Sequence, residues 1–320
     1  MARQDSRDSE VIRIVAAELA QPVPSAVGDL AQEIRRRHGE ALLACLFYGS
    51  CLRDWTVEGR VVDFYAIARD HRGFHGNPVS AVLNAILPPN VYYLETLHEG
   101  QVLRAKYAVI SLAQLRRDTS ARCFLPTLWG RLAQPCALAY ARDRAVEEAV
   151  ARALAAAAET LLRRTLPLMP PRFTAREIWL RGFAESYRTE LRAERGGRAA
   201  LLYEAGARRY DRLARTLLGA SSPPEDAEPG EAVLLRHQGG RLERQKAGLG
   251  WWGRRVLGRS LHVLRLAKAA YTFTGGLDYV LWKIETHSGV RAEPTAWQRR
   301  HPLIAAPKLA WQLYRRGAFR

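Results

Sequence analysis

The most constraining feature of the sequence is an apolar run at residues 41–48 that stops abruptly at Gly49 and Ser50. A helical pattern at residues 25–38 precedes this run, so the two together predict a helix followed by a buried strand. A glycine and a serine directly after a buried strand allow a sharp turn that exposes backbone N–H groups and a hydroxyl. Such a turn is suited to hold phosphate oxygens, and the alternative is a plain turn without a ligand.

A second apolar stretch, at residues 60–68, contains Asp63. A carboxylate inside an apolar strand is costly to bury unless it binds a cation or a hydrogen-bond donor. Asp63 is therefore a candidate metal ligand, and the alternative is an aspartate on a half-exposed strand. A strand ending in Gly-Ser, a short helical link and a strand carrying Asp resemble the nucleotidyltransferase superfamily of DNA polymerase beta.

Several further segments resemble one family within that superfamily. They are Phe47-Tyr48-Gly49-Ser50, Val62-Asp63-Phe64 with Asp70 and Phe74-His75, Val91-Tyr92-Tyr93, Lys106-Tyr107-Ala108-Val109-Ile110-Ser111, and Trp129-Gly130-Arg131-Leu132 to Pro135. In this order they are similar to the mitochondrial-type phosphatidate cytidylyltransferases, continuously over residues 46–135 and more loosely to residue 218. The resemblance implies an enzyme that uses CTP and Mg²⁺ to convert phosphatidate into CDP-diacylglycerol.

The resemblance also implies roles for individual residues. Asp63 and Lys106 are expected to be catalytic, with the Lys106 ammonium neutralising charge on phosphates; a surface lysine is the alternative. The expected nucleotide-binding residues are Tyr48, Gly49, Ser50 and Arg131, and the possible substrate contacts are Asp70, His75 and Tyr92. The chain departs from the family where Cys51 and Ala108 replace glycines and Leu94 replaces an asparagine.

The second metal ligand is the open question of the site. The superfamily often places two carboxylates two residues apart on one strand face, but Tyr65 takes the second place after Asp63. Asp70 would lie about 23 Å away on a straight strand and on the opposite face, so only a bend after Ala68 brings it close. Glu95, on a hairpin strand, is the preferred partner of Asp63, and a solvated edge glutamate is the alternative.

The rest of the chain predicts an α+β protein with a small mixed sheet and flanking helices. Helices are expected at residues 25–38, 78–87, 142–162, 174–192 and 199–218, strands at 41–48, 60–68, 91–97 and 101–112, and a turn at Glu99-Gly100. The expected units are a nucleotidyltransferase domain at 1–140, an all-helical domain at 141–220, a Pro- and Ser-containing linker at 221–250, and a basic helical extension at 251–320.

The C-terminal extension carries much of the positive charge. Residues 251–320 contain 13 Lys and Arg against 3 Asp and Glu, and five of the eight tryptophans, in a chain of net charge +17. This composition fits a helical subdomain, a nucleic-acid platform or an interfacial membrane anchor. We favour the membrane, with contacts from Trp251, Trp252, Arg254, Arg255, Arg315 and Arg316, because anionic lipids contribute about 1 kcal/mol per basic residue.

Other features limit the setting of the protein. The four cysteines form no CxxC pair, so neither a zinc site nor a disulfide framework is expected. No secretory signal or membrane-spanning segment is evident, and the Ala- and Arg-rich composition suggests the cytoplasmic face of a bacterial membrane. A nucleic-acid-directed nucleotidyltransferase and a non-catalytic scaffold are the competing functions, although no stable nucleic-acid partner is expected. The sequence leaves the oligomeric state open.

Overall fold

The computed structural model describes residues 2–190, 197–219, 234–272, 276–288, 290, 293–300 and 302–316. The first half of the chain forms α1 (Ala2–Leu19), α2 (Ser25–His38), η1 (Gly39–Ala41), β1 (Leu42–Tyr48), α3 (Ser50–Asp54), β2 (Val61–Ala68), α4 (His71–His75), α5 (Pro78–Ile86), β3 (Asn90–His98), β4 (Gln101–Ser111), α6 (Leu112–Thr119), α7 (Trp129–Leu132), β5 (Cys136–Ala141) and α8 (Arg144–Thr165). The second half forms η2 (Leu166–Leu168), β6 (Arg172–Thr174), α9 (Ala175–Tyr187), α10 (Arg198–Glu204), α11 (Ala207–Leu218), β7 (Leu234–Arg236), α12 (Arg241–Thr272), α13 (Gly276–Ser288), α14 (Ala296–Arg300) and α15 (Pro302–Arg315). The protein therefore has the α+β class that its sequence predicts.

The main sheet has five strands in the order β3-β4-β2-β1-β5. β2 and β4 are parallel, whereas the other neighbouring pairs are antiparallel, so the sheet is mixed as expected. β3 and β4 form the predicted hairpin, and Glu99 and Gly100 at its turn have φ angles of 48° and 80°. The sheet therefore follows the helix, strand and hairpin pattern of the sequence closely.

The two faces of the sheet are covered by different helices. Cys45, Phe47 and Phe64 point to one face, in a core that includes α2. Leu46 and Tyr65 point to the opposite face, in a larger core shared with helices α8 to α11, which we call the helical unit. Because neighbouring strand residues alternate between faces, Tyr48 and Asp63 also face the helical unit. This alternation decides on which side of the sheet the candidate site lies.

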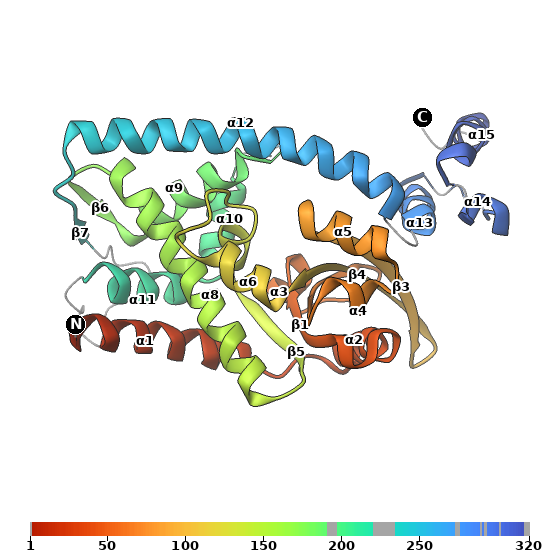
Figure 1. Ribbon diagram of the computed structural model, residues 1–320, viewed down its shortest axis with the longest axis horizontal. Helices are drawn as coiled ribbons and strands as arrows, with labels where there is room; N and C mark the ends of the chain where they lie inside the picture. The colour runs from red at the N-terminus through yellow and green to blue at the C-terminus, as the bar shows by residue number, and fades with distance from the viewer. Residues whose placement is uncertain are drawn as a thin grey trace.

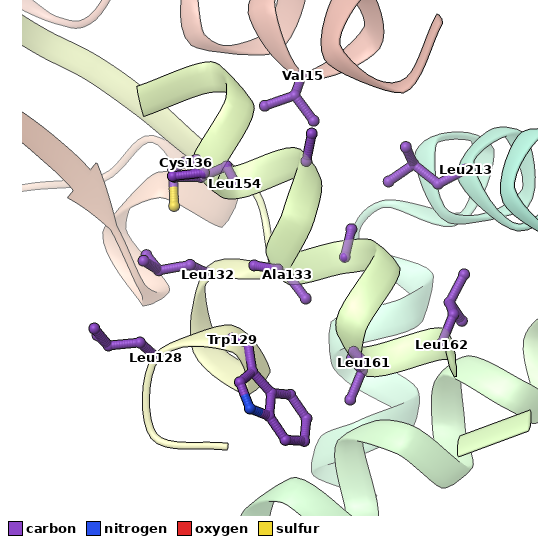
Figure 2. Packing of buried hydrophobic residues seen from close by; sticks show 14 of the residues in the cluster. Val15, Leu128, Trp129, Leu132, Ala133, Cys136, Leu154, Leu161, Leu162 and Leu213 are labelled. Atoms are coloured by element: carbon purple, nitrogen blue, oxygen red, sulfur yellow. The ribbon is translucent and has the colours of Figure 1, made fainter. Parts of the chain in front are cut away.

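The larger core joins the sheet to the helical unit. Figure 2 shows side chains from α1, α7, α8 and α11 meeting in this core, including Val15, Trp129, Leu154 and Leu213. Trp129 is fully buried and forms an edge-to-face contact with Trp251 of α12, with ring centroids 5.7 Å apart. The three-dimensional position of α7, which carries Arg131, is therefore fixed by packing on both sides.

α12 is a single helix of 32 residues that runs along one side of the molecule (Figure 1). It contacts η2 in the helical unit and β3 at the far edge of the sheet. Two anchors hold it: Trp251 Nε1 donates to the Arg164 carbonyl, and Lys268 Nζ donates to the Leu87 and Pro89 carbonyls. None of the helices in the described part of the chain is both long and apolar enough to span a membrane.

Several elements differ from the sequence predictions. α1 and β5 were not anticipated, and α1 packs against α8, α11 and β5. The helix expected at 174–192 ends at Tyr187, and the helix expected at 199–218 is divided before Ala207. The unit expected to be all-helical also contains β6, which pairs with β7. Strands of three residues are too short to show a period of two.

The structure describes only part of the expected linker at residues 221–250. Residues 220–233 lie outside the described residues. From residue 234 onward the chain forms β7 and then α12, which begins at Arg241 and continues without interruption across residue 250. The expected start of a separate extension at residue 251 therefore falls inside a helix.

Candidate active site

Three residues on adjacent strands form a row across the sheet. Asp63 of β2 pairs with Tyr48 of β1 on one side and with Lys106 of β4 on the other. The Asp63 Oδ1 atom lies 2.9 Å from Lys106 Nζ, and the two side chains remain 26% and 33% exposed. All three line a cavity of about 450 Å³ between the sheet, α7, the end of α9 and α12.

The Gly49-Ser50 turn lies at the end of this row. Gly49 has φ 95° and ψ −155°, a backbone conformation that residues other than glycine rarely adopt. A Cβ atom at Gly49 would also lie 3.3 Å from Asp63 Oδ2. Glycine therefore allows the backbone to approach the carboxylate closely, and Ser50 follows as an exposed residue on the cavity wall.

Two tyrosines form the floor of the cavity beside Asp63. The rings of Tyr48 and Tyr65 stack with centroids 4.7 Å apart. Burial raises the pKa of Tyr48 well above its usual range, so the hydroxyl stays protonated at neutral pH. Tyr65 thus supplies an aromatic surface two residues after Asp63, at the position that the sequence analysis considered for a second carboxylate.

Arg131 reaches the same cavity from α7. Its Nη2 atom lies 2.7 Å and 2.9 Å from the two carboxylate oxygens of Glu190. Burial alone would lower the pKa of Arg131, but Tyr65 and Glu190 raise it well above its usual range, so the guanidinium stays charged. Glu190 orients Arg131, and this contact was not anticipated because Glu190 follows α9, far from Arg131 in the sequence.

α12 contributes residues that the sequence analysis did not identify. Gly258, His262, Arg265, Ala269 and Thr272 line the cavity, at alternating spacings of four and three that place them on one helical face. The sequence contained an indication, because Lys268 interrupts the apolar row that Leu257, Leu261 and Leu264 form on one face of this helix. The second half of α12, from Gly258 to Thr272, is therefore part of the cavity wall.

The residues of the cavity fit a magnesium ion only when substrate phosphates supply some of its ligands. In the described part of the chain, no cluster of three or more His, Cys, Asp or Glu side chains is placed to hold a metal. Glu190 lines the cavity but is engaged by Arg131. Because Mg²⁺ is commonly bound by one or two carboxylates together with substrate phosphates, Asp63 fits an ion that enters with a nucleotide, not one held by protein alone.

Glu95 does not meet Asp63 in this structure. It lies on β3, two strands from β2, and its pairing row is offset by two residues. With strands ~4.8 Å apart and ~3.3 Å per residue, the two Cα atoms are about 12 Å apart. Glu95 instead accepts hydrogen bonds from the Tyr93 hydroxyl and from Arg104. The expected shared metal site of Asp63 and Glu95 is therefore not formed.

The three possible substrate contacts lie away from the cavity. Asp70 caps α4 by accepting a hydrogen bond from the Gly73 backbone, and no bend returns it to Asp63. Tyr92 faces the opposite side of the sheet, where its hydroxyl contacts His75 Nδ1. These residues therefore support α4 and α5, because the alternation along β3 directs Tyr92 away from the cavity.

The histidines on that opposite face form a half-buried network around Asn84. Asn84 Nδ2 lies 3.0 Å from a ring nitrogen of His71 and of His75, and it donates to the Val109 carbonyl. Burial lowers the pKa of His38 and His71, and burial with neighbouring histidines lowers the pKa of His75 to about 4. The folded protein therefore favours the neutral histidines.

Acid is expected to destabilise the protein through this network. The pKa of His75 is about 6.5 in the unfolded chain and about 4 in the folded protein. The contribution of His75 to folding stability is therefore complete above pH 6.5 and is lost as pH falls towards 4. Urea unfolding should show a free energy of unfolding that is lower at pH 5 than at pH 7.5 by on the order of 1 kcal/mol, a value that allows for the partial solvent exposure of His75. A His75→Asn variant should lose less stability between these pH values; an equal loss would contradict the assignment.

The expected membrane residues divide into buried and exposed groups. Trp251 and Arg254 are 1% and 4% exposed, and Arg254 Nε donates to the Phe124 carbonyl, so neither is available to a membrane. Arg255 is half-buried beside Glu185. Trp252, Arg315 and Arg316 are exposed. Sequence could not separate Trp251 from Trp252, because adjacent helical residues differ by about 100° in direction.

Comparisons with known proteins add no assignment. No model of a known protein family matches the chain, and no curated protein matches it. The fold and the site together define an α+β protein in which a Gly-Ser turn, an aspartate and several basic side chains share one cavity.

Proposed function

We propose that this protein is a nucleotidyltransferase that transfers CMP from CTP to phosphatidate at an anionic membrane surface. The observation that carries the proposal is the cavity in which the Gly49-Ser50 turn meets Asp63 and Lys106. Among the described residues, five basic side chains line this cavity against two carboxylates, namely Arg53, Lys106, Arg131, Arg198 and Arg265 against Asp63 and Glu190. Such an excess of positive charge is suited to a polyphosphate substrate.

The proposed reaction is an in-line displacement at the α phosphorus of CTP. A phosphate oxygen of phosphatidate forms a new P–O bond, and the bond to the β phosphate breaks to release pyrophosphate. A phosphomonoester has a second pKa of about 6 and is largely ionised at neutral pH, so no general base is needed. Positioning and charge neutralisation then account for catalysis.

The residues of the cavity divide these tasks. The backbone of the Gly49-Ser50 turn and the Ser50 hydroxyl hold the β and γ phosphates. Lys106 and Arg131 neutralise charge on the departing pyrophosphate. Asp63 would hold Mg²⁺ that arrives with the nucleotide, and the ion would supply positive charge to the phosphates. The Asp63–Lys106 salt bridge keeps both side chains directed into the cavity.

The choice of CTP and phosphatidate rests on the resemblance of the sequence blocks. The choice of a membrane rests on α12, whose outer surface carries the exposed residues Leu242, Leu249, Trp252, Val256 and Val263. Leu249, Val256 and Val263 each precede a cavity-lining residue by nine positions, about two and a half turns, and so lie opposite the cavity. An exposed apolar row on a basic helix is typical of interfacial membrane binding, here at the cytoplasmic face of a bacterial membrane.

The proposal is tested by measuring pyrophosphate release from each of the four NTPs with Mg²⁺, with and without phosphatidate in anionic vesicles. Release is expected with CTP and phosphatidate together, and EDTA should abolish it. The protein should sediment with the vesicles, and Trp252→Ala should sediment less than the wild type. Release that requires RNA or DNA would indicate a nucleic-acid enzyme, and no release or nucleotide binding would indicate a scaffold.

A further inference from the structure

A second, smaller cavity adjoins the candidate active site. It has a volume of about 200 Å³ and lies between the end of α5, β4, the segment before α7, α12, and the ion pair of Arg117 and Asp118 on α6. Apolar side chains dominate its wall, among them Leu87, Ile110, Leu125, Leu128 and Leu261. We call it the side chamber. Because an apolar cavity of about 150 Å³ is large enough to bind benzene, the side chamber can accommodate several methylene groups.

The side chamber and the active-site cavity meet at shared residues. Pro89, Thr127 and Arg265 line both. Arg265 Nε donates to the Pro88 carbonyl at 2.7 Å, and its Nη1 atom lies 3.3 Å from Thr127 Oγ1. These contacts fix the guanidinium at the junction between a basic cavity and an apolar one.

Arg265 differs from Lys106 and Arg131, the two basic residues assigned to the departing pyrophosphate. Lys106 is paired with Asp63, and Arg131 with Glu190. Within the described residues Arg265 forms no salt bridge, and its hydrogen-bond partners are a carbonyl and a hydroxyl. Burial lowers the pKa of Arg265, and the nearby Tyr65 and Glu190 offset this only in part. A partly buried cation of this kind is stabilised when an anion enters the cavity.

We infer that the side chamber binds the hydrocarbon chain of the acceptor, while Arg265 binds the acceptor's phosphate at the chamber mouth. The ligand is therefore an amphiphile with a phosphate at one end and a chain at the other. This inference rests on the proposed transfer to a lipid phosphate and adds where the acceptor sits. It also predicts that α12 contributes a substrate-binding residue in addition to a membrane-facing surface.

The test uses the full-length protein and measures the binding of methyl, butyl and octyl phosphate by calorimetry without nucleotide. Affinity should rise with chain length, by about fourfold for each methylene group that becomes buried. Leu261→Phe, which narrows the side chamber, should weaken octyl phosphate binding at least tenfold and leave methyl phosphate unchanged. Arg265→Gln should weaken all three ligands to a similar extent.

The matched control is Leu264→Phe, because Leu264 lies on the same helix, is 55% exposed and does not line the side chamber. It should leave all three affinities unchanged. Affinities that do not depend on chain length, or equal effects of the two phenylalanine variants, would overturn the inference.

The binding assay separates this inference from the proposed function. Chain-length-dependent binding without pyrophosphate release from any nucleotide would support the side chamber and refute the transferase. Release that depends on CTP and phosphatidate, with no chain-length effect on binding, would support the transferase and refute the side chamber. Thermal unfolding of each variant verifies that the fold is retained.

Discussion

Asp63→Asn is expected to lower the rate of CMP transfer by about a thousandfold or more, in the upper range of effects for a lost electrostatic contact in an active site. Asparagine keeps the size and shape of aspartate but lacks the charge that is paired with Lys106. It therefore removes the one carboxylate that faces the cavity from β2. Pyrophosphate release under saturating CTP and phosphatidate measures the effect.

Two controls make the Asp63 result interpretable. The melting temperature of Asp63→Asn should stay close to that of the wild type, because the half-exposed pair contributes little to stability. Glu95→Gln should change the transfer rate less than twofold, because Glu95 is held by Tyr93 and Arg104 outside the cavity. Retained activity in Asp63→Asn, or a large loss in Glu95→Gln, would refute the assigned site.

Gly258→Ala is expected to destabilise the protein by about 1–3 kcal/mol, the usual cost of an overpacked contact. A Cβ atom at Gly258 would lie 2.7 Å from the Thr189 carbonyl oxygen and 3.0 Å from Thr189 Cβ. The carbonyl is part of the backbone, so α12 itself must move away from the end of α9. The same displacement would disturb the cavity, and we expect transfer to fall at least tenfold.

Gly248→Ala is the matched control for this effect. It lies in the same helix, and a Cβ atom there would meet nothing within 4 Å. Alanine should therefore stabilise the protein, by up to about 1 kcal/mol, through its higher helix propensity. Urea unfolding of the two variants compares them directly. Equal effects would show that α12 does not pack closely on Thr189.

The sequence predicts the sheet half of the site well, because the relevant information is local. The apolar run before Gly49, and Asp63 within a strand, are visible as patterns of neighbouring residues. The alternation along β2 and β4 then directs Asp63 and Lys106 to one face. Fold class and the turn could therefore be derived without coordinates, whereas the strand register could not, because Glu95 was expected beside Asp63 and the structure pairs Asp63 with Lys106.

The other half of the site depends on contacts between distant segments. Glu190 meets Arg131 only because α7 and α9 pack together, and Arg265 reaches the cavity only because α12 crosses the molecule. Glu190 and Arg265 were missed, whereas Tyr92 was wrongly expected in the site. The resemblance suggested a substrate contact for Tyr92, but its position on β3 directs it to the other face of the sheet. Periodicity identifies the face of an element but not the element that packs against it.

The continuity of α12 restricts how substrates enter. A helix of 32 residues is about 48 Å long, and it is fastened at Trp251 to the helical unit and at Lys268 to the segment before β3. α12 therefore connects the helical unit to the sheet rigidly and resists a hinge motion between them, in contrast to proteins whose domains close around a ligand. Under the proposed function, we expect nucleotide and acceptor to exchange through the mouth of the cavity, so that turnover depends on side-chain movements there and not on domain rotation.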